Sequence, residues 1–567
     1  MSVRSIAEVR AQWETHPFAH IWQEQFQAVF ESIGDDVSGA DADAESGFEV
    51  ILQEEFGLSL DELFELIPGQ ACVALYNWVE LLTVGADEEF QEAAAPDAVL
   101  MIEYAGDEDE LHRLMDVQFH RNWRIQKELN PLIEHTMLQE SFMGETLYFD
   151  ERFNGEEAAI EDGYALVDGI FILATTIERM QATVEAIKAG LDESIVDENA
   201  YLRAKDEGGR GDCSFYLNLA AIMPELTDSI FDESIDSGLA MFGVTSKSLG
   251  DALALESATA LFANLDTEPD GVLCSAGLIY SEKRGLLELL AYDSGELPTA
   301  RYVPESTLSA SLSSFNVSDM LANLEKTVRV ASPAMMPLFD IQLSQVKNTT
   351  GIDLRSALID NFSGGIVSMT SMPESEDVVD RAGQPEQVLI MEIKDAQALS
   401  AALEALKDML PMVKPMLKEQ DYEGYTIYSL SDASGVESSE QVSYTITRDK
   451  LIICVGRVGY LQTVLTRLDA DGEGLWEAAG TELLFDRISA PQAVTRSYVD
   501  LSQYMDTMLE TLATTMLLEE LFEDFALSLL PSELNAELRM VSEVNEASDG
   551  FFTRILLVDL NAETLSN

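Results

Sequence analysis

The sequence predicts an α+β fold with two homologous halves, each a mainly antiparallel sheet with helices packed on one side. Residues 96–103 (PDAVLMIE) recur as residues 385–392 (PEQVLIME), and further matches follow in the same order. Short apolar runs rich in β-branched residues alternate with longer runs of helical spacing. Polar two-residue turns join several of the short runs, which favours hairpins. Strands joined by hairpins run antiparallel, so a parallel doubly wound sheet is the second alternative.

The repeat is the strongest evidence for two halves. Six landmarks occur twice in the same order, and insertions or deletions explain the drift in their spacing. They begin at Gly57 and Gly351, Pro96 and Pro385, Gly144 and Gly424, Tyr164 and Tyr444, Tyr216 and Tyr498, and Asp270 and Asp549. We therefore predict a first half at residues 1–297 and a second half at residues 298–567.

The individual elements follow from periodicity. The runs 98–104 and 451–455 predict buried strands, and 167–170 and 447–450 predict hairpin turns. Apolar residues spaced by three and four predict helices at 3–30, 108–137, 396–417, 502–530, 176–187 and 458–468.

The two halves begin differently. The second half starts with residues 303–312 (VPESTLSASL) before its first helix, whereas the first half has only Met1, Ser2 and Val3 there. We expect the opening strand of the first half to be mostly missing. Any export segment would then have preceded Met1.

The chain is very acidic. It has 103 Asp and Glu residues against 33 Lys and Arg, a formal net charge of -70. Residues 1–300 hold 61 acidic and 15 basic residues, and residues 301–567 hold 42 and 18. Nucleic acid and anionic lipid surfaces are expected to repel such a chain. The 47% hydrophobic fraction nevertheless suffices for packed cores.

Two interpretations fit the acidity. Carboxylates with few lysines suit solubility at high salt, where the Debye length falls to roughly 3 Å at 1 M. Binding of divalent cations is the other interpretation, and the sequence favours a solvated surface over it.

A calcium loop is one candidate site. Asp469, Asp471 and Glu473 stand at positions 1, 3 and 5 of a loop with glycine at position 6, as in the front of an EF-hand. Glu477 is the nearest further ligand, but position 12 is Gly480 rather than glutamate. An acidic turn between helices is the favoured alternative. We predict no other cofactor.

The five histidines all lie in the first half. His16 and His20 are four residues apart and could share a zinc ion, but Pro17 interrupts the stretch. The second half has no histidine, so histidine chemistry is not an activity that both halves could share.

Other motifs have structural explanations. The sequence Arg-Gly-Asp at residues 210–212 matches a tripeptide found in adhesive proteins. A glycine-rich turn explains these residues without an adhesive function. Four separated cysteines predict small buried side chains in strands rather than a redox pair: Cys72, Cys213, Cys274 and Cys454. No apolar run reaches the ~18 residues of a membrane span. We find no nucleophile elbow, P-loop or dinucleotide motif.

Several motifs resemble a bacterial domain-of-unknown-function family, family 3352. The resemblance rests on residues 303–307 (VPEST), on residues 351–354 (GIDL) before Gly364, and on residues 57–60 (GLSL) before Pro68. Members are often exported proteins of planctomycetes, cyanobacteria and their relatives. The resemblance implies an exported protein of the periplasm, cell envelope or exterior, and it supplies no catalytic residues.

Together these features predict a non-enzymatic envelope or extracellular scaffold that binds a protein partner or assembles with itself. A small-ligand or lipid-binding exported protein is one alternative. A hydrolase with an unfamiliar site is the other.

Overall fold

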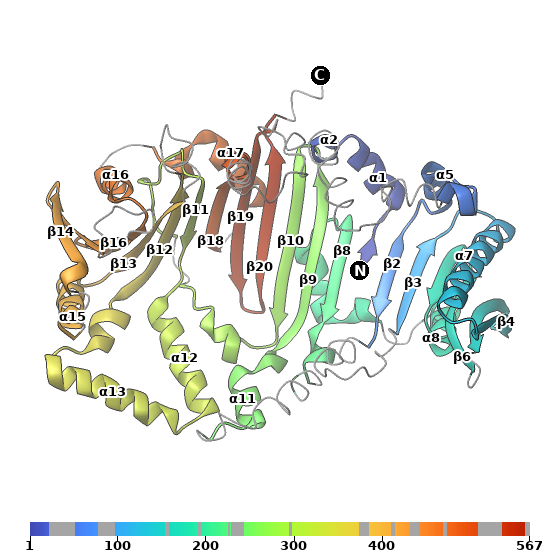
Figure 1. Ribbon diagram of the computed structural model, residues 1–567, viewed down its shortest axis with the longest axis horizontal. Helices are drawn as coiled ribbons and strands as arrows, with labels where there is room; N and C mark the ends of the chain where they lie inside the picture. The colour runs from blue at the N-terminus through green and yellow to red at the C-terminus, as the bar shows by residue number, and fades with distance from the viewer. Residues whose placement is uncertain are drawn as a thin grey trace. The chain divides into compact units, whose positions relative to one another are not determined.

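The computed structural model of the chain forms two compact units, which we describe separately (Figure 1). The first contains 1–226 and 260–269, and the second contains 227–259 and 270–567. The structure describes residues 1–21, 52–77, 97–153, 158–190, 194–224, 227, 243–293, 297–372, 385–409, 414–430, 442–468, 473–490, 492–507 and 536–561.

The first unit is built on an antiparallel sheet with strand order β9-β8-β1-β2-β3-β7-β6-β5-β4. The strands are β1 (Ser2–Val3), β2 (Ala71–Leu75), β3 (Ala98–Glu103), β4 (Glu134–Phe142), β5 (Glu145–Phe153), β6 (Ala158–Val167), β7 (Ile170–Ala174), β8 (Cys213–Asn218) and β9 (Ala258–Glu268).

The second unit has an antiparallel sheet with strand order β10-β20-β19-β18-β11-β12-β13-β17-β16-β15-β14. The strands are β10 (Gly271–Tyr280), β11 (Ser309–Ser313), β12 (Phe362–Ser371), β13 (Glu386–Ile393), β14 (Leu417–Tyr422), β15 (Tyr425–Leu430), β16 (Val442–Ile446), β17 (Lys450–Val455), β18 (Ala493–Asp500), β19 (Leu538–Ala547) and β20 (Gly550–Asp559).

The strand orders of the two units correspond. Each strand of the first unit's order has a counterpart in the second unit whose number is higher by ten. The order β9 to β4 of the first unit thus becomes the order β19 to β14 of the second. All the described pairings are antiparallel, which confirms the α+β prediction and excludes a parallel doubly wound sheet for the described strands. The compact units differ from the halves 1–297 and 298–567, because β10 pairs with β20. Compactness and sequence repetition are different criteria, so the repeat boundary stays a prediction.

Both predicted hairpin turns form, at 167–170 between β6 and β7 and at 447–450 between β16 and β17. Asp168 (φ 50°) and Gly169 (φ 82°) join β6 to β7, which is the two-residue turn expected for Asp-Gly. Glu423 (φ 49°) and Gly424 (φ 90°) make the same kind of turn between β14 and β15.

Helices cover both faces of the second sheet, so the prediction of helices on one side is wrong. Leu451 of β17 shares an apolar cluster with Leu399 of α15 (Ala396–Met409). The next residue, Ile452, belongs to a core that contains Leu461 of α16 (Val458–Leu468). Neighbouring strand residues point to opposite faces, so these helices lie on opposite faces. A near-continuous apolar strand is typical of such double coverage.

The first sheet has the same double coverage. Phe149 of β5 packs in a cluster with Met180 of α8 (Ile177–Ala189). On the other face, Tyr164 of β6 stacks on Phe119 of α7 (Glu108–Leu129). Ala165, the neighbour of Tyr164, belongs to the α8 cluster.

Several predicted helices are shorter than their patterns. Helix α7 ends at Leu129 because Pro131 follows, and β4 begins at Glu134. The pattern 396–417 contains α15 at its start and the first residue of β14 at its end, and residues 410–413 lie outside the described residues. Residues 3–21 contain α1 (Ile6–Glu14) and α2 (Pro17–Ile21), separated before Pro17. The remainder of that pattern, and residues 508–530 of another, lie outside the described residues.

The other helices are α5 (Leu60–Leu66), α9 (Asn199–Glu207), α11 (Ser246–Leu253), α12 (Val317–Ala331), α13 (Met335–Thr350) and α17 (Ala479–Ile488). Ser59 begins α5 with a reciprocal capping box to Glu62. In the part of the chain that the structure describes, no helix combines the length and apolar character needed to cross a bilayer.

Candidate functional site

Each unit places two tyrosines side by side at the same position in its sheet. Tyr148 of β5 lies opposite Tyr164 of β6, and Tyr428 of β15 lies opposite Tyr444 of β16. The rings stack with centroids 4.9 Å apart and 11° between planes in the first unit, and 5.0 Å and 16° in the second. Cross-strand aromatic pairs of this kind stabilise a sheet and fix its register.

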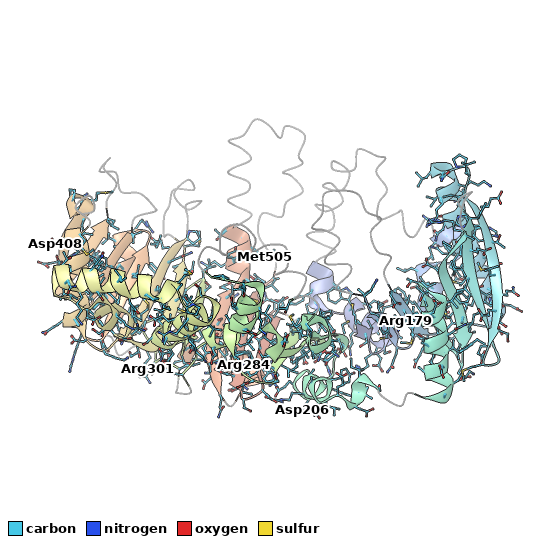
Figure 2. All side chains as sticks on the ribbon, turned by 90° about the horizontal axis from the view of Figure 1, so that it is seen from below. Arg179, Asp206, Arg284, Arg301, Asp408 and Met505 are labelled. Carbon is cyan, nitrogen blue, oxygen red and sulfur yellow. The ribbon has the colours of Figure 1, made fainter. Side chains whose placement is uncertain are left out.

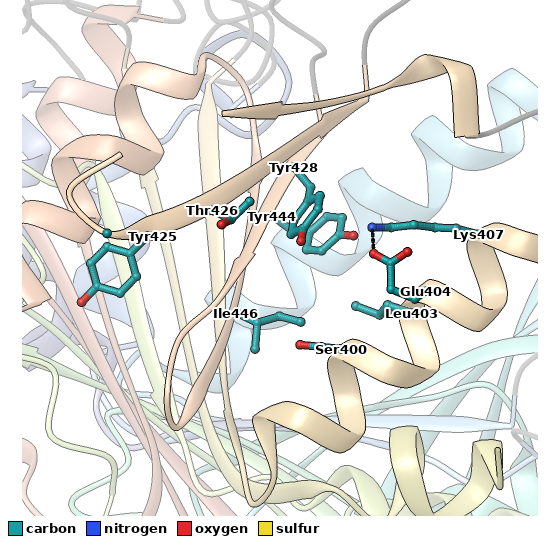
Figure 3. A pocket seen from close by; sticks show the side chains of 10 residues that line it. Ser400, Leu403, Glu404, Lys407, Tyr425, Thr426, Tyr428, Tyr444 and Ile446 are labelled. Carbon is teal, nitrogen blue, oxygen red and sulfur yellow. Dashed lines mark hydrogen bonds and ion pairs between the residues drawn. The ribbon is translucent and has the colours of Figure 1, made fainter. Parts of the chain in front are cut away.

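In the second unit, Lys407 of α15 covers the tyrosine pair (Figure 3). Its Nζ lies 4.0 Å from the centroid of the Tyr428 ring and donates a hydrogen bond of 2.6 Å to Oε1 of Glu404. Burial acts to lower the pKa of Lys407, but hydrogen bonds to Glu404 and Tyr444 together outweigh burial and raise it. The Lys407 side chain is therefore protonated and positively charged at neutral pH. Burial raises the pKa of the Tyr444 hydroxyl, against the opposing effect of Lys407.

A cavity of about 240 Å³ adjoins this pair, between α15 and the strands β15 and β16. Ser400 and Glu404 line it from the helix, and Thr426 and the two tyrosines line it from the sheet (Figure 3). Aromatic rings, the hydroxyl groups of Ser400, Thr426 and the tyrosines, and a charged pair suit a small polar ligand better than an apolar one.

Removing the cation tests how much Lys407 stabilises the second unit. We expect Lys407→Met to lower the free energy of unfolding by about 1–2 kcal/mol, because a desolvated cation–π contact is lost. Urea unfolding measures the change. Glu404→Gln is the control and should cost less than about 1 kcal/mol, since Glu404 is 56% exposed. Equal losses in both variants would show that the ion pair, rather than the ring contact, matters.

In the first unit, histidine replaces lysine above the tyrosines. The Nδ1 of His112, on α7, lies 3.0 Å from the Tyr164 hydroxyl, and its ring is 4.6 Å from the Tyr148 ring. Nε2 of His112 lies 3.5 Å from Glu108. Burial raises the pKa of Tyr164. In each unit, the covering helix therefore places one basic and one acidic side chain beside that unit's own tyrosine pair.

A second buried polar cluster lies beneath α7. Asp150 of β5 accepts a 2.8 Å hydrogen bond from Nε1 of Trp123, and its Oδ1 and Oδ2 each lie 3.0 Å from Nδ1 of His135. The His135 ring stacks on Trp123. No sequence motif pointed to this cluster, because its members come from three separate elements.

The zinc alternative for His16 and His20 finds no support at His16. The buried His16 ring accepts a hydrogen bond from the Phe18 N–H at Nδ1, and its Nε2 lies 3.1 Å from the Glu268 carbonyl. The His20 side chain lies outside the described residues. No three His, Cys, Asp or Glu side chains within the described ranges are placed to hold a metal ion together.

The adhesive tripeptide is a structural turn. The Asp212 side chain is 2% exposed, and its carboxylate accepts hydrogen bonds from Arg4 (2.8 Å) and from the Thr267 N–H (2.9 Å). Gly209 and Gly211 both have positive φ values, as the glycine-rich turn requires. A receptor could not reach this carboxylate without unfolding the turn.

The calcium loop is described only in part, because Asp469 and Asp471 lie outside the described residues. Glu477 accepts a hydrogen bond from the Gly474 N–H at 3.2 Å and pairs with Arg301 at 3.3 Å (Arg301 is labelled in Figure 2). The Glu473 carbonyl accepts from Arg467. The prediction of a calcium site therefore remains open.

The four cysteines lie in β2, β8, β10 and β17, as the sequence predicted, and all are free thiols. Only Cys454 is buried; the other three are half-buried, so the prediction of buried side chains is wrong for them. Burial raises the pKa of Cys454 to about 12, and it also raises the pKa values of Cys213 and Cys274. A raised pKa disfavours the reactive thiolate.

Comparisons with known proteins place this chain in no family. No family model and no curated protein matches it. Among solved structures, crystal forms I, III and IV of TP0453 are similar at a TM-score of 0.22 and 10% identity. They cover 48% of this chain and 97% or 98% of their own. A likeness this small carries no argument about fold or function.

Proposed function

We propose that this protein is a non-enzymatic scaffold of the cell envelope or exterior, built from two homologous halves that present different side chains on one framework. The observation that carries the proposal is the matching strand order with a stacked tyrosine pair at the same place in each unit. The sequence landmarks supply independent support, since Tyr164 and Tyr444 are themselves a repeated pair.

Binding rather than catalysis fits what differs between the units. The shared part is backbone register and aromatic packing, whereas the covering helices carry different charged groups, His112 in one and Lys407 in the other. A framework that varies its surface while keeping its core suits recognition of partners. The resemblance to family 3352 supports an exported location.

The net charge of -70 supports a role in a salty exterior, where screening reduces self-repulsion. Calcium at Asp469, Asp471, Glu473 and Glu477 remains part of the proposal as a modulator.

Light scattering coupled to size exclusion tests the scaffold. We expect the full chain to form complexes, with itself or with a protein captured from an envelope extract, at one or more of several salt and calcium concentrations. A strict monomer under all conditions that also captures no partner would contradict the proposal.

The cavity beside Tyr428 favours a second candidate function, the binding of a small polar ligand. Native mass spectrometry of the purified protein would detect a co-purified molecule. Ser400→Trp should fill the cavity and remove the additional mass, while Ser356→Trp, outside this cavity, should leave it. No additional mass on the unmodified protein would count against this candidate.

A further inference from the structure

The C-terminal part of α7 concentrates basic residues in a very acidic chain. Residues 117–127 contain no Asp or Glu, yet they include His120, Arg121, Arg124 and Lys127. The whole chain has 33 Lys and Arg among 567 residues. Cations in the last turns of a helix are also favoured by its dipole, so this placement is locally stable.

Packing against the sheet orients this helix. Phe119 is buried against Tyr164, and Trp123 is hydrogen-bonded to Asp150. These contacts fix the rotation of α7 about its axis. His120, Arg124 and Lys127 follow one another by four and three residues, share one face and are exposed.

Exposed apolar side chains lie beside this basic face. Ile125 is 43% exposed and Leu129 is 83% exposed, one turn apart on the helix. Leu132, just beyond the helix end, is 73% exposed. We define the α7 patch as Arg121, Arg124, Lys127, Ile125, Leu129 and Leu132. Arg121 is half-buried and lies one turn before Arg124 and Ile125 on the same side of the helix, and the exposed Glu128 adjoins the patch. Apolar groups with charged neighbours are typical of a protein interface.

We propose that the α7 patch binds an acidic surface on a second copy of this chain. The inference rests on the scaffold proposed above and names its partner and contact surface. A second copy offers the required chemistry, because it carries a net charge of -70. An anionic membrane would attract the patch but repel the remainder of the chain, so charge favours the protein partner.

The β14–β15 hairpin is the acidic surface that we assign to the contact. Glu419, Asp421 and Glu423 are exposed on it, and Met416 beside it is 39% exposed. Within the described residues, β14 pairs with β15 alone and is a sheet edge. The patch and the hairpin are different surfaces, so the contact is heterologous and joins copies head to tail.

Helix α15, at the corresponding place in the second unit, has no such patch. In the second unit, the corresponding helix α15 has one basic residue, Lys407, whose side chain is 11% exposed and covers Tyr428. We therefore do not propose a contact in which the second unit of one copy binds the second unit of another copy.

Sedimentation velocity of the full chain tests the proposal at 50 mM and 500 mM NaCl. We expect association at low salt that weakens at least tenfold at high salt. The triple variant Arg121→Glu/Arg124→Glu/Lys127→Glu should weaken it at least tenfold at low salt. The matched control is Lys326→Glu/Arg329→Glu/Lys347→Glu, which makes the same change in net charge on exposed positions of α12 and α13 and should retain association.

Two further variants distinguish loss of the proposed contact from misfolding of α7. Leu129→Ser/Leu132→Ser leaves the charge unchanged and should also weaken association, which guards against misfolding of the charge-reversed helix. Glu419→Lys/Asp421→Lys/Glu423→Lys should not self-associate, but should bind the α7 charge-reversed chain when the two are mixed.

Each other outcome overturns the assignment. Equal loss in the α12–α13 control would indicate general repulsion. Sedimentation of monomeric protein with phosphatidylglycerol vesicles would assign the patch to a lipid surface. Association that survives α7 charge reversal would refute the patch and leave the scaffold standing, whereas a monomer that binds no partner would refute both.

Discussion

Replacing Arg496 with methionine is expected to lower the free energy of unfolding of the second unit by about 3–5 kcal/mol. Arg496 Nε donates a 2.6 Å hydrogen bond to Oε1 of Glu543, whose side chain is 1% exposed. The Ala490 N–H donates to the other carboxylate oxygen. Methionine retains much of the packing against Phe485 but leaves a buried carboxylate without its cation.

Urea unfolding with hydrogen exchange at β18 and β19 measures this loss. Arg487→Met is the matched control, because Arg487 pairs with Asp270 at an exposed position and should cost less than about 1 kcal/mol. The double variant Arg496→Met/Glu543→Met should recover more than half of the loss, since it also removes the buried charge. No recovery would show that the arginine acts through packing.

Alkaline pH is expected to destabilise both units steeply. Tyr164, Tyr280 and Tyr302 are buried, and burial raises the pKa of each hydroxyl, to about 12 for Tyr280. An unfolded tyrosine loses its proton near pH 10, so above that pH the unfolded state binds fewer protons than the folded state. The stability that these buried tyrosines contribute is therefore fully present below pH 10, and it is lost as the pH rises toward 12. Each group contributes up to about 1.4 kcal/mol per pH unit to the slope of the unit that contains it.

Urea midpoints between pH 8 and pH 11.5 measure this slope. Tyr302→Phe removes one of these groups and should reduce the slope of the second unit above pH 10 by up to about 1.4 kcal/mol per pH unit, while the slope below pH 9 stays the same. An unchanged slope in Tyr302→Phe would contradict this explanation.

Sequence patterns predicted the elements that local chemistry determines. The pattern at 458–468 coincides with α16, and the Asp168-Gly169 turn forms where an Asp-Gly pair was found. Helix ends were harder, because α7 stops at Leu129 and the apolar spacing continues into β4. Coverage of both faces was missed although residues 98–102 and 451–455 are continuously apolar, which is the pattern of strands buried on both faces.

The sequence repeat identified the tyrosines of the candidate site but not the side chains that cover them. Tyr148 and Tyr428, and Tyr164 and Tyr444, occur at matching positions of the repeat. Their stacking depends on the register between strands, which no single segment encodes. Lys407 and His112 contact those rings from helices elsewhere in the sequence, so spacing alone could not associate them with the site.

The pairing of β10 with β20 has a consequence for synthesis on the ribosome. Gly271 lies opposite Val558, and nine such residue pairs join the two strands. Translation proceeds at roughly 5–20 residues per second, so β10 leaves the ribosome tens of seconds before β20 is made. Throughout that interval the β10 edge lacks this partner and can template pairing with another chain. The second unit is therefore most exposed to aggregation while the chain is still being synthesised, and a chaperone that covers β10 would be most effective then.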